Sequence, residues 1–153
     1  MSIKQDIHQQ RQFRNEHHKA TVNLLFSSNW LMENIKRFLQ AEDITPQQYN
    51  ILRILRGNGE PLSTLQIRER MLDKMSDTSR IVDRLLKKGL VEKKTKQADK
   101  RLVDVTISAK GMELLQRLDQ KNASLDGILF NLTHEDAKHL NQLLDKMRGS
   151  LDQ

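Results

Sequence analysis

The chain has 153 residues, 37% of them hydrophobic and 30% charged, which suits one compact domain in water. Its mean hydropathy of −0.68 and the lack of any apolar run near 18 residues argue against a membrane span. The absence of cysteine excludes disulfides, thiolate ligands, thiol nucleophiles and cysteine-based redox sensing within this chain. Residues 1–20 lack the apolar stretch of a signal peptide, so we expect a cytoplasmic protein.

The net charge of +6 is concentrated in the middle of the chain. Residues 53–101 contain 14 Lys and Arg against 7 Asp and Glu, whereas the rest contains 12 against 13. Such a segment suits a polyanion, because neutralised phosphates release condensed counterions. A solvated surface that happens to be basic is the alternative, so charge alone does not decide.

Two helices are predicted in the first third of the chain. Apolar residues recur near every 3.6 positions over residues 21–40, which predicts a long amphipathic helix ending near residues 42–44. Thr45 and Pro46 then supply an N-cap and a first-turn proline for a second helix. Residues 57–59, Gly-Asn-Gly, end that second helix.

Two shorter helices are predicted next. After an extended segment at 60–62, Ser63 or Thr64 caps a helix to about residue 71, with these inward-facing side chains: Leu65, Ile67 and Met71. Ser76 or Asp77 caps the following helix, which runs to residue 88 and stops at Gly89. Its inward-facing stripe is Ile81, Val82, Leu85 and Leu86.

Two strands and two helices complete the prediction. Residues 90–95 and 102–108 read as strands, and the charged turn at 96–100 joins them in a hairpin. Ser108 caps a long helix from residue 109 to about 131, and Thr133 opens the last helix. The sequence therefore predicts a mainly helical (α+β) fold, a winged helix-turn-helix whose wing is a small β-hairpin.

The helix at residues 76–88 is the candidate recognition helix. Its apolar stripe faces inward and leaves hydrogen-bonding side chains for the major groove, where Arg80 suits a bidentate pair with guanine. Ser76, Thr78 and Ser79 are short enough for base edges or phosphates. The predicted DNA contacts are Ser76, Asp77, Thr78, Ser79, Arg80, Arg84 and Lys87. The alternative is a solvated helix face, with Asp83 and Arg84 in local ion pairs.

The hairpin turn supplies the remaining predicted DNA contacts: Lys96, Asp99, Lys100 and Arg101. We assign Arg101 to the minor groove, where the negative potential deepens as the groove narrows. Asp99 repels phosphate, so we expect it to orient Arg101 or a neighbouring base. A simple Asx-turn is the alternative for Asp99.

A longer pattern covers residues 79–111, which read SRIVDRLLKKGLVEKKTKQADKRLVDVTISAKG. The recognition helix ends in R-L-x-x-x-G-L-V, the wing contains D-x-R at residues 99–101, and the next helix opens on S-x-x-G at residues 108–111. This pattern resembles the core signature of the MarR family of transcriptional regulators. Two departures are Ser79, where the family often has threonine, and Lys93, where a wing strand often has arginine.

The resemblance implies properties that composition does not show. Such proteins are homodimers with intertwined first and last helices, and they usually repress from pseudo-palindromic operators. Their two recognition helices lie about 34 Å apart, one helical turn of DNA. Many release DNA when a small phenolic or anionic ligand enters a pocket between the dimerisation helices and the DNA-binding lobe. For this chain we expect one domain over 1–153, a DNA-binding lobe at about 46–108, and dimerisation helices at about 5–42 and 109–150.

Three aromatic residues are candidates for such an effector pocket: Phe26, Trp30 and Tyr49. The favoured alternative for Phe26 and Trp30 is a place in the core or the dimer interface. The five histidines include no H-x3-H pair, so we expect structural or solvated roles, with a metal site between subunits left open.

No catalytic motif is found, and we expect neither an enzyme nor a cofactor. The predicted function is a sequence-specific, ligand-responsive regulator that binds double-stranded DNA. One alternative is a winged-helix module that docks a protein and binds DNA without sequence preference. A constitutive regulator without an effector is a further variant.

Overall fold

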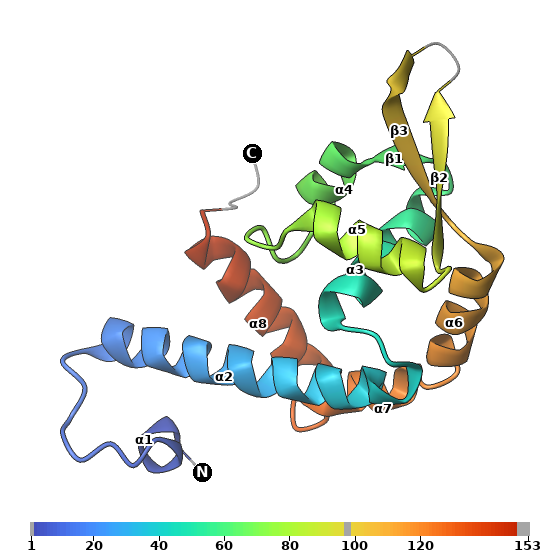
Figure 1. Cartoon of the computed structure of the whole chain (residues 1–153). Helices are drawn as coiled ribbons and strands as arrows, with labels where there is room; N and C mark the ends of the chain where they lie inside the picture. Colours follow the sequence, from blue (N-terminus) through green and yellow to red (C-terminus); the bar gives the residue numbers. More distant parts are fainter. Residues whose placement is uncertain (1, 97–98, 150–153) are drawn as a thin grey trace. The chain divides into compact units, whose positions relative to one another are not determined.

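The computed structural model describes the backbone of residues 2–96 and 99–149, and side chains within those ranges except at 96 and 99–102. The chain divides into two compact units, Met1–Gln120 and Lys121–Gln153. Figure 1 labels their helices and strands along the sequence. The prediction of one domain over 1–153 stays a prediction.

The N-terminal part of the first unit contains α1 (Ile3–Asp6), α2 (Glu16–Leu39) and the short η1 (Gln40–Glu42). The Asn15 side chain caps α2 by accepting a hydrogen bond from the His18 backbone N–H at 2.8 Å. Helix α2 therefore begins before residue 21 and includes the predicted long helix. Its last residue, Leu39, is fully buried, so this end is anchored in the core.

Helix α3 (Pro46–Asn58) has the predicted bounds. Thr45 and Gln48 form a capping box, since each side chain bonds the backbone N–H of the other. Pro46 occupies the first turn, where its missing N–H costs nothing. Gly59 follows with φ 74°, a left-handed conformation that glycine adopts without strain.

Helices α4 (Thr64–Arg70) and α5 (Thr78–Lys87) form the helix-turn-helix, capped by Ser63 and Asp77. Ile67 and Met71 are buried as predicted. The expectation for Leu65 is wrong, because its side chain is 64% exposed. A helix of seven residues buries only one narrow face, and Ile67 occupies that face of α4.

The sheet has three antiparallel strands in the order β1-β3-β2. They are β1 (Leu62–Ser63), β2 (Val91–Lys96) and β3 (Asp99–Ile107), and β3 starts three residues earlier than predicted. The register runs from Val91 opposite Ile107 to Thr95 opposite Val103, and shifts after Thr95. Because β1 also pairs with β3, the base of the hairpin is held against the helix-turn-helix. Figure 1 shows the hairpin extending beyond α4 and α5.

A single core joins α3, α4, α5, β3 and α6 (Ala109–Asp119) with the end of α2. Its side chains are aliphatic and interlock across these elements. The largest fully buried ones are Leu39, Ile51, Leu52, Ile67, Met71, Val82, Leu85, Val105, Leu115 and Leu118. The core thus fixes α5 by its inner face and leaves the outer face of α5 to solvent.

The predicted single helix over residues 109–131 is wrong. Helix α6 ends at Asp119, and the second unit contains α7 (Asn122–Asp126), η2 (Gly127–Leu129) and α8 (His134–Met147). After Leu118 the next leucine of the stripe is Leu125, so one full helical turn has no large apolar side chain to hold it on a core. Thr133 opens α8 as predicted, in a capping box with Asp136.

Apolar side chains are exposed on a long helix of each unit. On α2 they are Leu24, Leu25, Phe26, Trp30 and Met32, and on α8 they are Leu140, Leu143 and Met147. No helix within residues 2–96 and 99–149 is long and apolar enough to cross a membrane. Exposed apolar groups gathered on one helix are typical of surfaces that contact another protein.

Arg56 of α3 and Asp119 of α6 form a bidentate ion pair, with Nη1–Oδ2 at 2.6 Å and Nη2–Oδ1 at 3.2 Å. Hydrogen bonding to Arg56 holds the pKa of Asp119 below its ordinary 3.8. The stabilisation is therefore complete above the ordinary pKa and is lost as the pH falls through the lowered folded value.

We expect Asp119→Asn to lower the free energy of unfolding by about 1 kcal/mol at pH 7, a modest effect because the pair is partly exposed. Urea unfolding at pH 7 and pH 3 measures this, and the difference between the two proteins should be smaller at pH 3, below the ordinary pKa of 3.8. An equal difference at both pH values would contradict the role of the carboxylate.

Candidate DNA-binding interface

Helix α5 separates its side chains into two faces. Val82 and Leu85 are buried, at 1% and 0% exposed, because the 3.6-residue period turns both toward the core. The exposed side chains of α5 include Ser79, Arg80, Arg84 and Lys87. Of the residues predicted from this helix, these four lie where a ligand outside the protein can contact them.

Asp77 makes two contacts with Arg80 at the start of α5. Its Oδ1 accepts a hydrogen bond from the Arg80 backbone N–H at 3.2 Å, which caps the helix. Its Oδ2 lies 3.4 Å from the Arg80 Nε, and the Arg80 side chain remains 81% exposed. Asp77 thus orients Arg80 and leaves most of the guanidinium available.

Thr78 is predicted as a DNA contact, but the structure buries its side chain. Its side chain is only 4% exposed and packs against the protein, so it is not one of the presented residues. The first position of α5 turns inward because the next residues, Ser79 and Arg80, occupy the outer face. The Thr78 hydroxyl is buried and has no hydrogen-bond partner in the described chain.

A cross-element ion pair links α5 to the wing. The Lys93 ammonium of β2 lies 3.3 Å from the Asp83 carboxylate of α5. Asp83 is therefore paired with the wing strand, and Lys93, the departure from the family pattern, takes part in this link. The pair is half-exposed and contributes orientation more than stability.

The S-x-x-G pattern at residues 108–111 links the segment after α5 to the start of α6. The Ser108 hydroxyl donates to the Gly89 carbonyl at 2.6 Å and accepts from the Gly111 N–H at 3.1 Å. A Cβ on Gly111 would lie 2.3 Å from the carbonyl oxygen of Leu90, closer than any side chain tolerates. Ser108 and Gly111 therefore join the end of α5, the wing and the start of α6.

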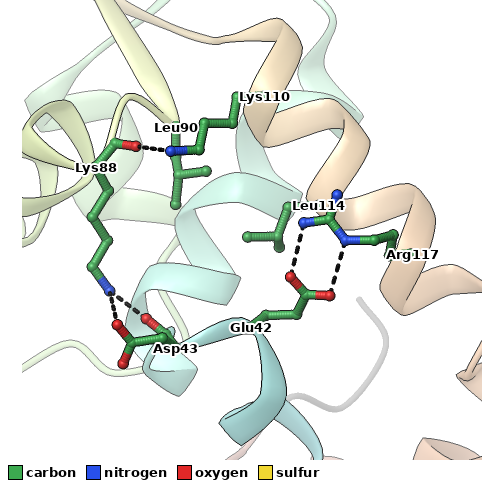
Figure 2. Close-up of a pocket in the computed structure, with 7 residues that line it drawn as sticks. All are labelled: Glu42, Asp43, Lys88, Leu90, Lys110, Leu114 and Arg117. Atoms are coloured by element: carbon green, nitrogen blue, oxygen red, sulfur yellow. Dashed lines mark hydrogen bonds and ion pairs between the residues drawn. The ribbon is translucent and has the colours of Figure 1, made fainter.

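Figure 2 shows a second set of contacts that holds the end of α5. The Lys88 ammonium donates to the Asp43 carbonyl, and the Lys110 ammonium donates to the Lys88 carbonyl at 2.9 Å. Arg117 binds Glu42 with two hydrogen bonds, of 3.0 and 2.8 Å. Cations near the C-terminal carbonyls of α5 suit the helix dipole, so this cluster is a support for α5.

The predicted wing contacts are only partly described. Lys96 ends β2 opposite Asp99, and residues 99–101 begin β3. The side chains of Lys96, Asp99, Lys100 and Arg101 lie outside the described residues. The orienting bond between Asp99 and Arg101 therefore stays a prediction.

The three candidate effector residues are not gathered in a described cavity. Tyr49 is buried and its hydroxyl accepts from Arg53 Nη1 at 3.0 Å, whereas Phe26 and Trp30 of α2 are 40% and 46% exposed. Neither the cavity of Figure 2 nor the groove between α4 and α5 includes these aromatics. Phe26 and Trp30 are too exposed for the core of this chain, and the effector pocket stays a prediction.

Sequence reasoning did not single out Thr64 and Arg68 of α4, which lie beside the first turn of α5. Both line a groove with the first turn of α5. Their spacing of four residues on one helix was a readable signal, since it places both on one side. What the sequence does not show is which side of α4 faces α5.

Comparison with known proteins supports this interpretation of the interface. A sequence model of the MarR family matches residues 42–102, from η1 through α5 and most of the wing. The HTH-type transcriptional repressor IacR of Pseudomonas putida is 28% identical over 121 residues, or 78% of this chain and 72% of that protein.

Two solved structures share the fold. The organohalide-sensing transcriptional regulator RdhR-CbdbA1625, bound to 2,4-dichlorophenol, has a TM-score of 0.81 and 21% identity, covering 89% of this chain and 81% of its own. A mutant MarR of Escherichia coli complexed with operator DNA has a TM-score of 0.78 and 23% identity, covering 90% and 99%. Residues 42–102 thus match the MarR family in sequence, and the chain has the winged helix-turn-helix fold of these two structures.

Proposed function

We propose that this chain is a sequence-specific regulator of transcription that binds double-stranded DNA as a homodimer and represses from a pseudo-palindromic operator. One observation carries the proposal: α5 exposes Ser79, Arg80 and Arg84 opposite its buried face and leads into a basic hairpin. Such an arrangement suits a helix in the major groove and a wing along the backbone. The repressor IacR and the operator complex of MarR support the same assignment.

Within residues 46–108 we assign distinct roles to the contacts. Arg80 reads a base edge, most favourably guanine, because its guanidinium is 81% exposed and oriented by Asp77. The short side chains of Ser76 and Ser79 and the longer ones of Arg84 and Lys87 contact base edges or phosphates. Lys96, Lys100 and Arg101 follow the backbone and minor groove, with Asp99 orienting Arg101.

The flanking helices, at about 5–42 and 109–150, form the dimer in this proposal. The exposed apolar side chains on α2 and on α8 favour a second copy of the chain as their partner. A two-fold dimer presents its recognition helices about 34 Å apart, to successive major grooves on one side of the DNA. Sedimentation of the free protein tests the oligomeric state.

A small aromatic or anionic effector is part of the proposal. The bound 2,4-dichlorophenol of RdhR-CbdbA1625 supports this class of ligand. The rings of Phe26 and Trp30 are partly exposed and so accessible to a ligand. The Tyr49 hydroxyl already accepts a hydrogen bond from Arg53. A thermal-shift screen of phenols and aromatic acids, followed by release of DNA by each hit, tests the effector.

The decisive test compares Arg80→Ala with Lys87→Ala on a duplex selected from a random library. We expect Arg80→Ala to lose about 1–3 kcal/mol of discrimination between the selected and a shuffled duplex. We expect Lys87→Ala to weaken binding to both duplexes equally and to reduce the salt slope by about 1. Fluorescence anisotropy titrations at several KCl concentrations measure both quantities.

Equal loss of discrimination in the two variants would contradict the base-reading role of Arg80. A wild-type protein that binds the selected and shuffled duplexes with a ratio near one would instead favour the winged-helix module without sequence preference.

A further inference from the structure

The turn between α4 and α5, residues 71–77, exposes two large apolar side chains to solvent. Leu72 is 87% exposed and Met75 is 93% exposed, and no large apolar side chain in the described part of the chain is more exposed than Met75. Figure 1 shows this turn as a loop beyond the ends of both helices. Isolated exposed apolar residues are common, so exposure alone does not indicate a contact. The order of the turn and its place before α5 give the exposure of Met75 a meaning.

Hydrogen bonds hold the turn in one conformation although it is exposed. The Leu72 N–H donates to the Asn50 side chain of α3 at 2.9 Å. The Asp73 carboxylate accepts from the Met75 N–H at 3.0 Å, and the Asp73 carbonyl accepts from the Ser76 hydroxyl at 2.7 Å. An aspartate that bonds the backbone N–H two residues later forms an Asx-turn. An ordered backbone therefore presents Met75, which lowers the entropy cost of binding there.

Met75 comes directly before the side chains that face DNA in the proposed function. Ser76 follows it, Asp77 caps α5, and the Arg80 side chain on the first turn of α5 is 81% exposed. The N-terminal residues of a recognition helix are those that reach base edges in the major groove. A duplex that Arg80 contacts therefore also comes close to Met75. The methionine side chain is long, unbranched and flexible, so it adapts to the surface that it meets.

The chemistry of Met75 matches one group of the major groove. Most of each base edge there consists of hydrogen-bond donors and acceptors, which a thioether satisfies poorly. The C5-methyl of thymine is the apolar exception. The surroundings favour DNA over an apolar peptide as the partner, because residues 53–101 contain 14 Lys and Arg against 7 Asp and Glu. An apolar side chain in a basic surface thus suits a polyanion that carries methyl groups.

We propose that Met75 reads the methyl group of a thymine beside the base that Arg80 contacts. The proposal rests on the DNA-binding function above and deepens it, since it adds an apolar contact to the hydrogen-bonded ones. This contact carries sequence information, because cytosine at the same place offers no methyl group. Arg80 and Met75 together then require a guanine and a thymine in a fixed order within each half of the operator.

Deoxyuridine in place of thymine tests the contact, because it removes only the methyl group and keeps the base pair. Each thymine of the selected duplex is replaced in turn, and anisotropy titrations compare the full-length wild type with Met75→Gln. At one thymine, the wild type should bind about fourfold more weakly, as expected for one methyl group returned to water. Met75→Gln removes the contact from both copies of the dimer. It should bind the unmodified duplex at least about tenfold more weakly and be insensitive to that replacement.

Two further variants are matched controls. Met75→Leu keeps an apolar side chain and should keep the sensitivity to deoxyuridine. Leu72→Ala removes a similarly exposed apolar side chain from an earlier place in the same turn, and should keep both the wild-type affinity and the sensitivity. Because the side chains of Leu72 and Met75 are exposed, all three variants should keep the melting temperature of the free protein.

The thymine contact and the proposed function fail in different ways. If no thymine shows a sensitivity that Met75→Gln removes, the contact does not exist, and a preference of the wild type for its selected duplex leaves the proposed function intact. If Met75→Gln binds DNA as the wild type does but sediments as a smaller species, Met75 belongs to a contact between copies and the proposal is overturned. If the wild type does not prefer its selected duplex to a shuffled one, the proposed function fails and the thymine contact falls with it.

Discussion

Gly111→Ala should lower the free energy of unfolding by about 2–3 kcal/mol. The new methyl would lie 2.3 Å from the Leu90 carbonyl oxygen and 2.8 Å from the Ile107 Cγ1. Alanine is favoured over glycine in a helix by at most about 1 kcal/mol, so the steric conflict outweighs the gain in propensity. Urea unfolding followed by circular dichroism measures the change, at one fixed protein concentration because assembly adds to stability.

Gly57→Ala is the control for this prediction. Gly57 lies within α3, and a Cβ there meets no atom within 4 Å. We expect this variant to be neutral or more stable by about 0.5–1 kcal/mol. If Gly111→Ala were as stable as Gly57→Ala, the junction between α5 and α6 would be able to yield, and the close approach at Leu90 would have no structural importance.

Arg101→Ala should weaken binding to the selected duplex at least about tenfold, or ~1.4 kcal/mol, without changing helix content or oligomeric state. Arg101→Lys should recover only the salt-dependent part, because an ammonium lacks the planar fork of the guanidinium. Lys94→Ala removes one exposed charge from β2 and is expected to have the smaller effect. Anisotropy titrations of the three variants measure these differences.

Wild-type affinity in Arg101→Ala would show that the wing does not enter the minor groove. The contribution of Asp99 is tested by Asp99→Asn, which should reproduce part of the Arg101→Ala loss if the carboxylate orients the guanidinium. A normal affinity in Asp99→Asn, beside a weak Arg101→Ala, would assign Asp99 to the turn alone.

The sequence predicts those features that depend on residues close together in the chain. The helix starts at Thr45, Ser63, Ser108 and Thr133 are confirmed, because an N-cap bonds a backbone N–H two or three residues later. The alternation of β-branched and apolar residues over 102–108 likewise predicts the second strand of the hairpin. These signals need no knowledge of the rest of the fold.

The features that sequence reasoning misses depend on residues far apart in the chain. Thr78 is buried and Leu65 is exposed because of how α4 and α5 pack, and periodicity alone does not fix the rotation of such short helices. The break after Asp119 coincides with the ion pair to Arg56, which is 63 residues away. The positive groove at Arg68 arises only when the two helices meet.

The hydrogen bonds of Ser108 couple α5 to α6. The Ser108 hydroxyl, which directly follows β3, connects Gly89, just beyond the C-cap of α5, with Gly111 in the first turn of α6. These bonds couple the end of α5 to the start of α6, so we expect a displacement of α6 to move α5 with it. In the proposed homodimer, an effector that shifts α6 would therefore change the spacing and tilt of the two α5 helices on the operator.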